Sequence, residues 1–265
     1  MIRKPAVSGM FYDSDPARLR RMVRGFIKDE PKTEALGVIV PHAGYIYSGT
    51  VAGVVYSRIT PRETYILLGP NHTGLGPAAS MMCRGEWETP LGAMKIDQRL
   101  ASSLLGGSEL LEEDTQAHLR EHSIEVQLPF LQILGGGTFI PITLMGIDYQ
   151  GCEKVASAIV EAVKACDRPV LIVASSDMTH FESRESAERK DRLALDRVEA
   201  LDPEGFYETV RRYRISMCGY IPATIMLIAA KALGAARAAV VRYATSGDVT
   251  GDMDQVVGYA GVIVE

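Results

Sequence analysis

The sequence predicts a single α/β domain over residues 1–265, with a mostly parallel or mixed central sheet flanked by helices. Three observations lead to this prediction. Short apolar runs without apolar/polar alternation are typical of strands covered on both faces. Amphipathic helical patterns lie between these runs, as in sheets built from strand–helix–strand units. The 265 residues, 47% of them hydrophobic, contain no repeat, low-complexity tract or long linker that would divide the chain.

Six segments have the composition of buried strands. In chain order they are ALGVIV (35–40), TYILLG (64–69), TFIPITL (138–144), PVLIVAS (169–175), AAVVRYA (238–244) and VGYAGVIVE (257–265). The segment 74–120 is irregular, and CRGEWETPLGAMKID within it indicates a hairpin insertion.

The segments between the strands carry helical periodicity. The clearest patterns cover 15–27, 123–134, 151–165 and 186–201. Ser48-Gly49 precedes TVAGVVYSRI, which predicts a capped helix. The most apolar segment, IPATIMLIAAKALGA, is interrupted by Lys231 after a short run. It therefore indicates a core helix, and we expect no membrane span.

Composition excludes several classes of protein. The formal net charge is −5 and the charges are mixed in sign, so the basic footprint of a nucleic-acid-binding protein is missing. The cysteines are far apart and form no CxxC pair, which predicts free thiols in a reducing cytoplasm; they are Cys83, Cys152, Cys166 and Cys218. The basic first residues are not followed by an apolar signal-type segment, so a cytoplasmic location is expected.

Three of the five histidines directly follow predicted strands. His42 follows VIV, His72 follows YILLGP, and His180 follows LIVASS together with Asp177. Ligands of open α/β sheets bind outside the carboxyl ends of the strands, so these side chains are expected to share one site. Imidazole binds iron, zinc and copper, and two histidines with one carboxylate are typical of ferrous oxygenases. The sequence therefore predicts a metal site containing His42 and His72.

The third metal ligand stays open at this point. His180, Asp177 and an acidic residue elsewhere are all candidates. His180 is also suited to general acid–base catalysis near neutral pH, with Asp177 orienting its ring. The alternative role for Asp177 is the N-cap of a helix that begins at Met178.

The segment HLREH (118–122) matches the inverted zinc-protease signature H-x-x-E-H, in which His118 and His122 would bind zinc and Glu121 would act as the base. No second ligand helix accompanies it. The favoured interpretation is a polar helix start, with His122 in a substrate pocket as the next alternative.

Three further residues are candidates for substrate binding. Tyr45 follows His42 closely and is suited either to a pocket wall or to the core. Ser246 and Asp248 follow the strand 238–244 and would reach the same sheet edge, unless ATSGD is an ordinary turn.

Several motifs together resemble the Memo family (mediator of receptor-driven cell motility). They are RKPAVSGMFYDSDPARL, VPHAGYIYSG, GPNHTG, WETPLG, EHSIEVQLPFLQ, SSDMTH and RYATSGD…GYAG, and they run nearly end to end. The chain looks like a prokaryotic member. The resemblance implies a fold similar to class III extradiol dioxygenases, which are non-haem iron enzymes. It also implies a functional association with a radical-SAM protein and its small partner.

The resemblance also implies roles for particular residues. His42 and His72 match the family's metal site, His180 matches the acid–base histidine of the related dioxygenases, and His122 matches a histidine near the pocket. Eukaryotic members add a cysteine ligand, whose position here is Val249. His180 is then the first choice for the third ligand and Asp248 the second. Iron or copper redox chemistry and phosphotyrosine-peptide binding are associated with the eukaryotic branch.

The leading hypothesis is a dioxygenase-like oxidoreductase that acts on a small substrate and holds Fe²⁺, with Zn²⁺ and copper as other metals. The alternative is a binding module that uses the same pocket for a peptide or small anion. A metal-dependent hydrolase is the third hypothesis.

Overall fold

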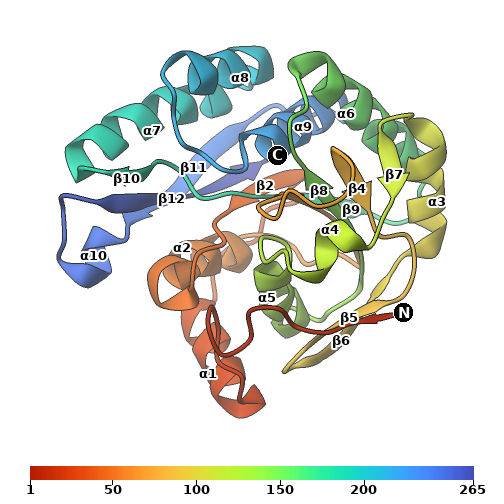
Figure 1. The fold of residues 1–265 in the computed structure, drawn as a ribbon, viewed down its shortest axis with the longest axis horizontal. Helices are drawn as coiled ribbons and strands as arrows, with labels where there is room; N and C mark the ends of the chain where they lie inside the picture. The colour runs from red at the N-terminus through yellow and green to blue at the C-terminus, as the bar shows by residue number, and fades with distance from the viewer.

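Four neighbouring parallel strands form the centre of the sheet in the computed structural model, which describes residues 1–265 (Figure 1). Across the sheet they are β8 (Thr138–Leu144), β3 (Thr64–Pro70), β9 (Val170–Ser175) and β2 (Gly37–Val40). Every residue of these four strands is buried except Thr138, the first residue of β8. The prediction of strands covered on both faces is confirmed, because these runs lie between two helix layers.

The complete sheet is mixed and has 12 strands. On the β2 side, β12 (Val256–Val264) runs antiparallel to β2 and carries β11 (Ala238–Thr245) and the short β10 (His180–Glu182). On the β8 side lie β6 (Gly92–Ile96), β5 (Glu86–Thr89), β1 (Ile2–Arg3), β4 (Ala79–Met81) and β7 (Leu111–Glu113). β5 and β6 form the hairpin expected in the irregular segment.

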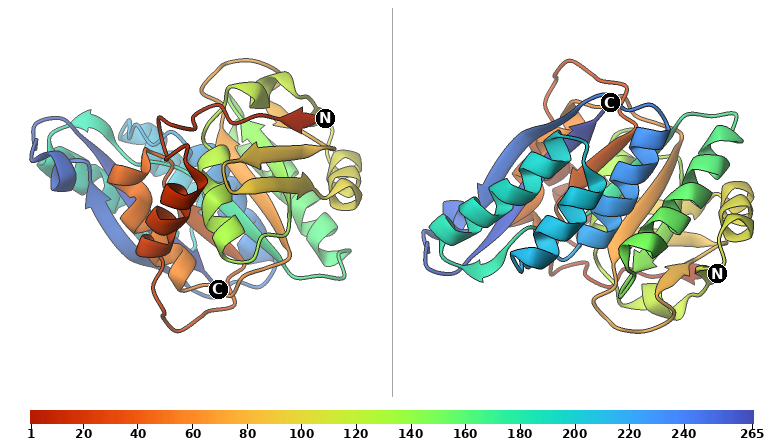
Figure 2. Two further views of the ribbon diagram at one scale, coloured as in Figure 1. Left: turned by 90° about the horizontal axis from the view of Figure 1, so that it is seen from below. Right: turned by 90° about the horizontal axis from the view of Figure 1, so that it is seen from above.

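Helices cover both faces of the sheet, as Figure 2 shows. One face carries α1 (Pro16–Phe26), α2 (Tyr45–Ser57) and α5 (Leu128–Ile133); the other carries α3 (Gln98–Gly107), α6 (Tyr149–Lys164), α7 (Arg184–Glu199), α8 (Pro203–Arg212) and α9 (Tyr220–Ala232). Shorter turns are α4 (Gln116–Leu119), the 3₁₀ helix η1 (Glu125–Gln127) and α10 (Gly247–Thr250). A single cluster of 71 buried hydrophobic residues joins the layers, so the α/β sandwich folds around one core.

Two helix boundaries differ from those expected. α2 begins at Tyr45 after Gly44, so Ser48 and Gly49 lie inside the helix instead of capping it. Gly49 is needed there for packing, since a Cβ on it would lie 2.5 Å from the Phe26 ring of α1. The predicted helix 123–134 is a 3₁₀ turn followed by α5. Pro129 lies in the first turn of α5, where its missing N–H is tolerated.

The first twelve residues are anchored across the molecule by a buried ion pair. The Arg3 guanidinium bonds to the Glu125 carboxylate, and neither side chain is exposed. Glu125 also accepts hydrogen bonds from Ala6 N (2.7 Å), Val7 N (3.1 Å) and Tyr12 Oη (2.5 Å). A buried charge is stable only with such complete pairing. The network therefore fixes the N-terminal segment beside the chain that carries residues 121–123.

No helix in the structure combines the length and the apolar character that crossing a bilayer requires.

Candidate metal centre

Three predicted site residues lie at one end of the central sheet. β3, β9 and β2 are neighbouring parallel strands, so their carboxyl ends meet at one edge. His72, Asp177 and His42 each follow the last residue of one of these strands by two positions. The topology thus brings together residues that are far apart in the chain.

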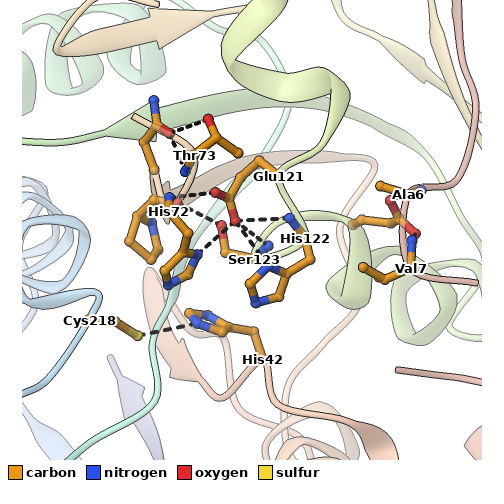
Figure 3. Close-up of polar contacts among 12 residues, drawn as sticks. Ala6, Val7, His42, His72, Thr73, Glu121, His122, Ser123 and Cys218 are labelled. Carbon is orange, nitrogen blue, oxygen red and sulfur yellow. Dashed lines mark hydrogen bonds and ion pairs between the residues drawn. The ribbon is translucent and has the colours of Figure 1, made fainter. Parts of the chain in front are cut away.

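Three imidazoles form a cluster at this edge. One ring nitrogen from each of His42, His72 and His122 lies within 4.8 Å of the other two. The ring centroids are 5.3 Å apart for His42 and His72, 5.4 Å for His42 and His122, and 4.7 Å for His72 and His122. Figure 3 shows the rings gathered around a common centre. The third histidine of the cluster is therefore His122 and not His180, which was the first choice from the sequence.

His122 reaches the cluster because its segment packs tightly over the end of β3. Ser123 Oγ donates to the Pro70 carbonyl at 3.0 Å. A Cβ on Gly69 would lie 2.4 Å from that hydroxyl, so a larger residue at Gly69 would push the segment away. This crossing is irregular backbone, and no strand-end rule predicts it.

The hydrogen bonds of Ser175 decide which nitrogen of His42 can act as a ligand. Ser175 Oγ donates its one hydrogen to the Ser123 carbonyl (2.6 Å) and accepts from Gln127 Nε2 (2.8 Å). His42 Nδ1, 3.0 Å from the same oxygen, must therefore be a donor. That leaves His42 Nε2 unprotonated, so its lone pair can accept a hydrogen bond or coordinate a metal. Burial, then the neighbouring histidines, lower the pKa of His42, so its ring is neutral near pH 7.

Glu121 orients His72 in the same way. Glu121 Oε1 accepts from His72 Nδ1 and from the backbone N–H groups of His122 and Ser123, each at 2.9 Å (Figure 3). Its Oε2 accepts from the His72 backbone N–H at 2.6 Å. Burial alone would raise the pKa of the Glu121 carboxyl, but these hydrogen bonds outweigh it and hold the pKa at about 2. An ionised acceptor keeps the proton on His72 Nδ1 and leaves Nε2 free.

Cys218 lies directly beside the cluster. Its Sγ is 3.2 Å from His42 Nε2 (Figure 3). The same sulfur accepts the Asp177 backbone N–H at 3.4 Å. Burial raises the pKa of the thiol, so the S–H group is the donor to His42. In the sequence Cys218 is one of four scattered cysteines, and only its spatial neighbour distinguishes it.

Asp177 does not orient His180, and that expectation is wrong. Asp177 Oδ1 accepts the backbone N–H groups of His42 (2.8 Å) and Ala43 (3.3 Å), so it holds the loop after β2. It is not an N-cap either, because β10 follows it and no helix does. Burial raises the pKa of Asp177 to about 6, against the opposing effect of the His42 N–H. The His180 ring instead contacts the Ser216 carbonyl through Nδ1 at 2.9 Å, which leaves Nε2 as an acceptor.

A residue absent from the sequence predictions, Asp191 of α7, positions the strand that carries His180. Its Oδ1 accepts from Thr179 N (3.0 Å) and Thr179 Oγ1 (2.6 Å), and its Oδ2 accepts from Tyr243 Oη (2.7 Å). Asp191 is completely buried. An acidic residue on the apolar face of the predicted helix 186–201 was the available signal.

Comparisons with known proteins are consistent across the whole chain. A family model described as "Memo-like protein" matches residues 3–263. The chain belongs to the Memo family. A "MEMO1 family protein" of Methanopyrus kandleri is 44% identical over 99% of both chains, and one of Methanocaldococcus jannaschii is 42% identical over 100% of this chain and 99% of the other.

One solved structure shares the fold at much lower similarity. It is described as an uncharacterized protein from Escherichia coli K12, with a TM-score of 0.50 and 12% sequence identity. The match covers 86% of this chain and 98% of that chain. At this identity the likeness shows the fold alone.

Val249, the position that the resemblance assigned to the cysteine of eukaryotic members, is remote from the cluster. Val249 lies on α10, is 54% exposed and does not line the histidine cavity. Asp248 bonds to Thr245 N and to the Arg184 guanidinium, both at 2.8 Å, so its carboxylate is already used. The cysteine of this chain that adjoins the cluster is Cys218.

Two of the three predicted substrate-binding residues also have structural partners. Tyr45 is buried in the core, where its hydroxyl donates to the Val126 carbonyl. Ser246 Oγ accepts the Val257 N–H at 3.0 Å. Neither residue lines the cavity, and the same holds for Asp248. Side chains two positions apart lie on different sides of a helix. Tyr45 therefore faces the core, whereas Tyr47 lines the cavity.

A cavity of about 430 Å³ opens above the cluster. Its lining combines the site residues with apolar side chains: Met10, Phe11, His42, Ala43, Gly44, Tyr47, His72, His122, Asp177, His180, Val257 and Tyr259. The Phe11 ring packs against the His122 ring with centroids 4.7 Å apart. The volume is within the range of small-molecule sites.

The zinc-protease interpretation of HLREH is wrong. α4 ends at Leu119, so His118 and His122 do not share a helix face. His118 packs beside Trp87 with ring centroids 5.7 Å apart, and neither of its ring nitrogens has a hydrogen-bond partner. Glu121 is committed to His72 and the backbone, so it is not available as a base.

The donor set of the cluster fits a divalent transition metal. His42 and His72 each present an unprotonated ring nitrogen, and His122 lies stacked on His72. A set of three imidazoles suits iron, zinc and copper. No carboxylate oxygen belongs to this cluster. The hydrogen bonds described above use both oxygens of Glu121 and Oδ1 of Asp177.

Proposed function

We propose that this protein binds a divalent transition metal, with Fe²⁺ as the first choice, and acts as a dioxygenase-like oxidoreductase on small molecules, including aromatic ones. The supporting observation is the cluster of His42, His72 and His122 at the floor of a cavity that His180 also lines. A metal there would be held by three side chains and would keep positions open toward the cavity.

The protein's own groups would supply positioning and proton transfer. Ferrous iron, when bound, supplies redox chemistry with molecular oxygen. Glu121 and Ser175 keep the ligand nitrogens of His72 and His42 unprotonated. His180 Nε2 is free to accept a proton from a substrate hydroxyl, since Nδ1 is held by the Ser216 carbonyl. Phe11 provides an apolar wall of the cavity beside His122.

A second candidate function is metal-dependent hydrolysis. The observation that favours it is the group of three histidines, since a three-histidine site can also hold catalytic zinc and activate water. Metal analysis of the protein purified from its own host separates the two candidates, with iron expected for the first and zinc for the second.

Metal binding is tested by anaerobic titration with Fe²⁺. We expect one ion per chain, with binding lost or weakened at least tenfold in His42→Ala, His72→Ala and His122→Ala. His118→Phe is the matched control, because His118 lies outside the cluster. Unchanged stoichiometry and affinity in all three cluster variants would refute the metal centre.

Catalysis is tested by oxygen consumption of the iron-loaded protein with a panel of catechols and hydroxy-aromatics. We expect His180→Gln to retain Fe²⁺ but to lower turnover by about 10²–10⁴-fold, the range for a general base. No oxygen consumption by any iron-loaded sample would favour a binding module that retains the pocket without the chemistry.

A further inference from the structure

The cavity above the histidine cluster lacks permanently cationic side chains, which are the strongest anion-binding groups. None of its twelve lining residues is a lysine or an arginine. The nearby Arg184 is paired with Glu188 and Asp248 instead. The lining contains one carboxylic acid, Asp177. When it is ionised, its negative charge disfavours a second negative charge in the cavity.

The imidazoles themselves present acceptors to the cavity. His42 and His72 are protonated on Nδ1, which leaves the lone pair of each Nε2 facing the cluster. His180 uses Nδ1 on the Ser216 carbonyl, so its Nε2 is an acceptor too. A carboxylate or phosphate needs donors, and these three rings provide none without a metal.

Several backbone donors at the cavity wall are also occupied. Asp177 takes the N–H groups of His42 and Ala43. At the start of α2, the Tyr45 N–H donates to the Phe11 carbonyl at 2.8 Å, and the Tyr47 N–H donates to the Gly44 carbonyl at 2.9 Å. These four N–H groups are therefore not available to an anion in the cavity.

The part of the lining formed by the N-terminal segment and α2 is apolar. Met10 and Phe11 come from the segment held by Arg3 and Glu125, and Tyr47 comes from the first turn of α2. Met10 is 72% exposed, so this large apolar side chain lies at the surface end of the cavity. A ligand that reaches from the histidines to Met10 would cross from polar to apolar surroundings.

We propose that the cavity takes a molecule whose polar end lies at the histidine cluster and whose uncharged, apolar end lies against Met10, Phe11 and Tyr47. The site discriminates against ligands that carry an anionic group at the apolar end. This inference rests on the proposed function for the polar end, since the metal provides the attraction there. It argues against a phosphorylated peptide or free anion as the natural ligand.

The test compares two catechols that share the polar end and differ at the tail. 4-Propylcatechol has a neutral tail, and 3-(3,4-dihydroxyphenyl)propanoate ends in a carboxylate at the corresponding distance. Binding to the Fe²⁺-loaded protein is measured anaerobically by calorimetry. We expect the neutral ligand to bind at least tenfold more tightly.

Met10→Lys places a cation at the apolar end of the site, and it should shift the ratio of the two dissociation constants at least fivefold toward the anionic ligand. Since Met10 is 72% exposed, the substitution leaves the core intact. Leu75→Lys is the matched control, because Leu75 is 45% exposed and does not line the cavity. Its ratio should equal that of the wild type.

The outcomes separate this inference from the proposed function. Equal or tighter binding of the carboxylate by the wild type overturns the inference alone, as does a Met10→Lys ratio no different from that of Leu75→Lys. An Fe²⁺-loaded protein that binds neither catechol also excludes the named ligand class. A chain that takes up no Fe²⁺ overturns the proposed function, and this inference falls with it.

Discussion

Replacing Glu121 with glutamine tests whether the orientation of His72 is a requirement for metal binding. The carboxylate accepts four hydrogen bonds. Two come from His72, from Nδ1 to Oε1 and from the backbone N–H to Oε2, and two come from the backbone N–H groups of His122 and Ser123 to Oε1. An amide has one oxygen and one NH₂ group. In one orientation the NH₂ group faces the backbone N–H of His72, so two donors meet. In the other it donates to His72 Nδ1 and moves the ring proton to Nε2, the ligand nitrogen.

The structure allows the size of both effects to be estimated. The pKa of Glu121 is held at about 2, against an ordinary value of 4.5, so the folded state favours the ionised form by about 3 kcal/mol. A depressed pKa stabilises the fold above pH 4.5 and loses this contribution as the pH falls toward 2. At pH 7, Glu121→Gln should therefore lower the free energy of unfolding by about 3 kcal/mol. Metal affinity should fall about 10–100-fold, as for other groups that orient a histidine ligand.

The assays are urea unfolding of the metal-free protein and titration with Zn²⁺ or Fe²⁺ against a competing chelator. Glu88→Gln is the matched control, because Glu88 pairs with the exposed Lys4 at the surface and should change stability by less than about 0.5 kcal/mol. A Glu121→Gln protein that is destabilised as expected but binds metal within twofold of the wild type would refute the orientation argument. An unchanged unfolding free energy would refute the hydrogen-bond argument itself.

Three further predictions concern other buried groups. Cys218→Ala removes the S–H donor to His42 Nε2 and should tighten Zn²⁺ binding by about fivefold in chelator competition. Cys218→Ser keeps a donor, so tighter binding by that variant would contradict this explanation. Arg3→Met leaves Glu125 charged and buried and should cost about 3–5 kcal/mol in urea unfolding, against less than about 1 kcal/mol for the exposed Lys4→Met. Burial lowers the pKa of His118 to about 4, so the unfolded state alone binds this proton between pH 6.5 and 4 and the protein should lose about 3 kcal/mol over that range. His118→Phe should reduce this loss of stability between pH 6.5 and 4, as measured by urea unfolding. A variant with the same pH dependence as the wild type would contradict the assignment to His118.

Much of the fold follows from local pattern. The unalternating runs at 64–69 and 169–175 became β3 and β9, because strands covered on both faces need apolar side chains on both. The ends of the helices are harder to predict from local pattern. Gly49 lies inside α2, where it allows close packing on Phe26, and this contact joins two helices that the local pattern treats separately.

Local pattern alone predicts that His42, His72 and Asp177 follow strands, and the rule for parallel sheets then brings them to one edge. The role of each residue there depends on its tertiary contacts. Hydrogen-bond partners far apart in the chain assign Asp177 to the backbone of residues 42 and 43 and leave His180 to the Ser216 carbonyl. His122 and Cys218 join the centre through irregular segments, whose paths depend on long-range contacts and have no periodicity. Periodicity reports which face of an element is buried, whereas the chemistry of a site depends on which atoms from different elements meet.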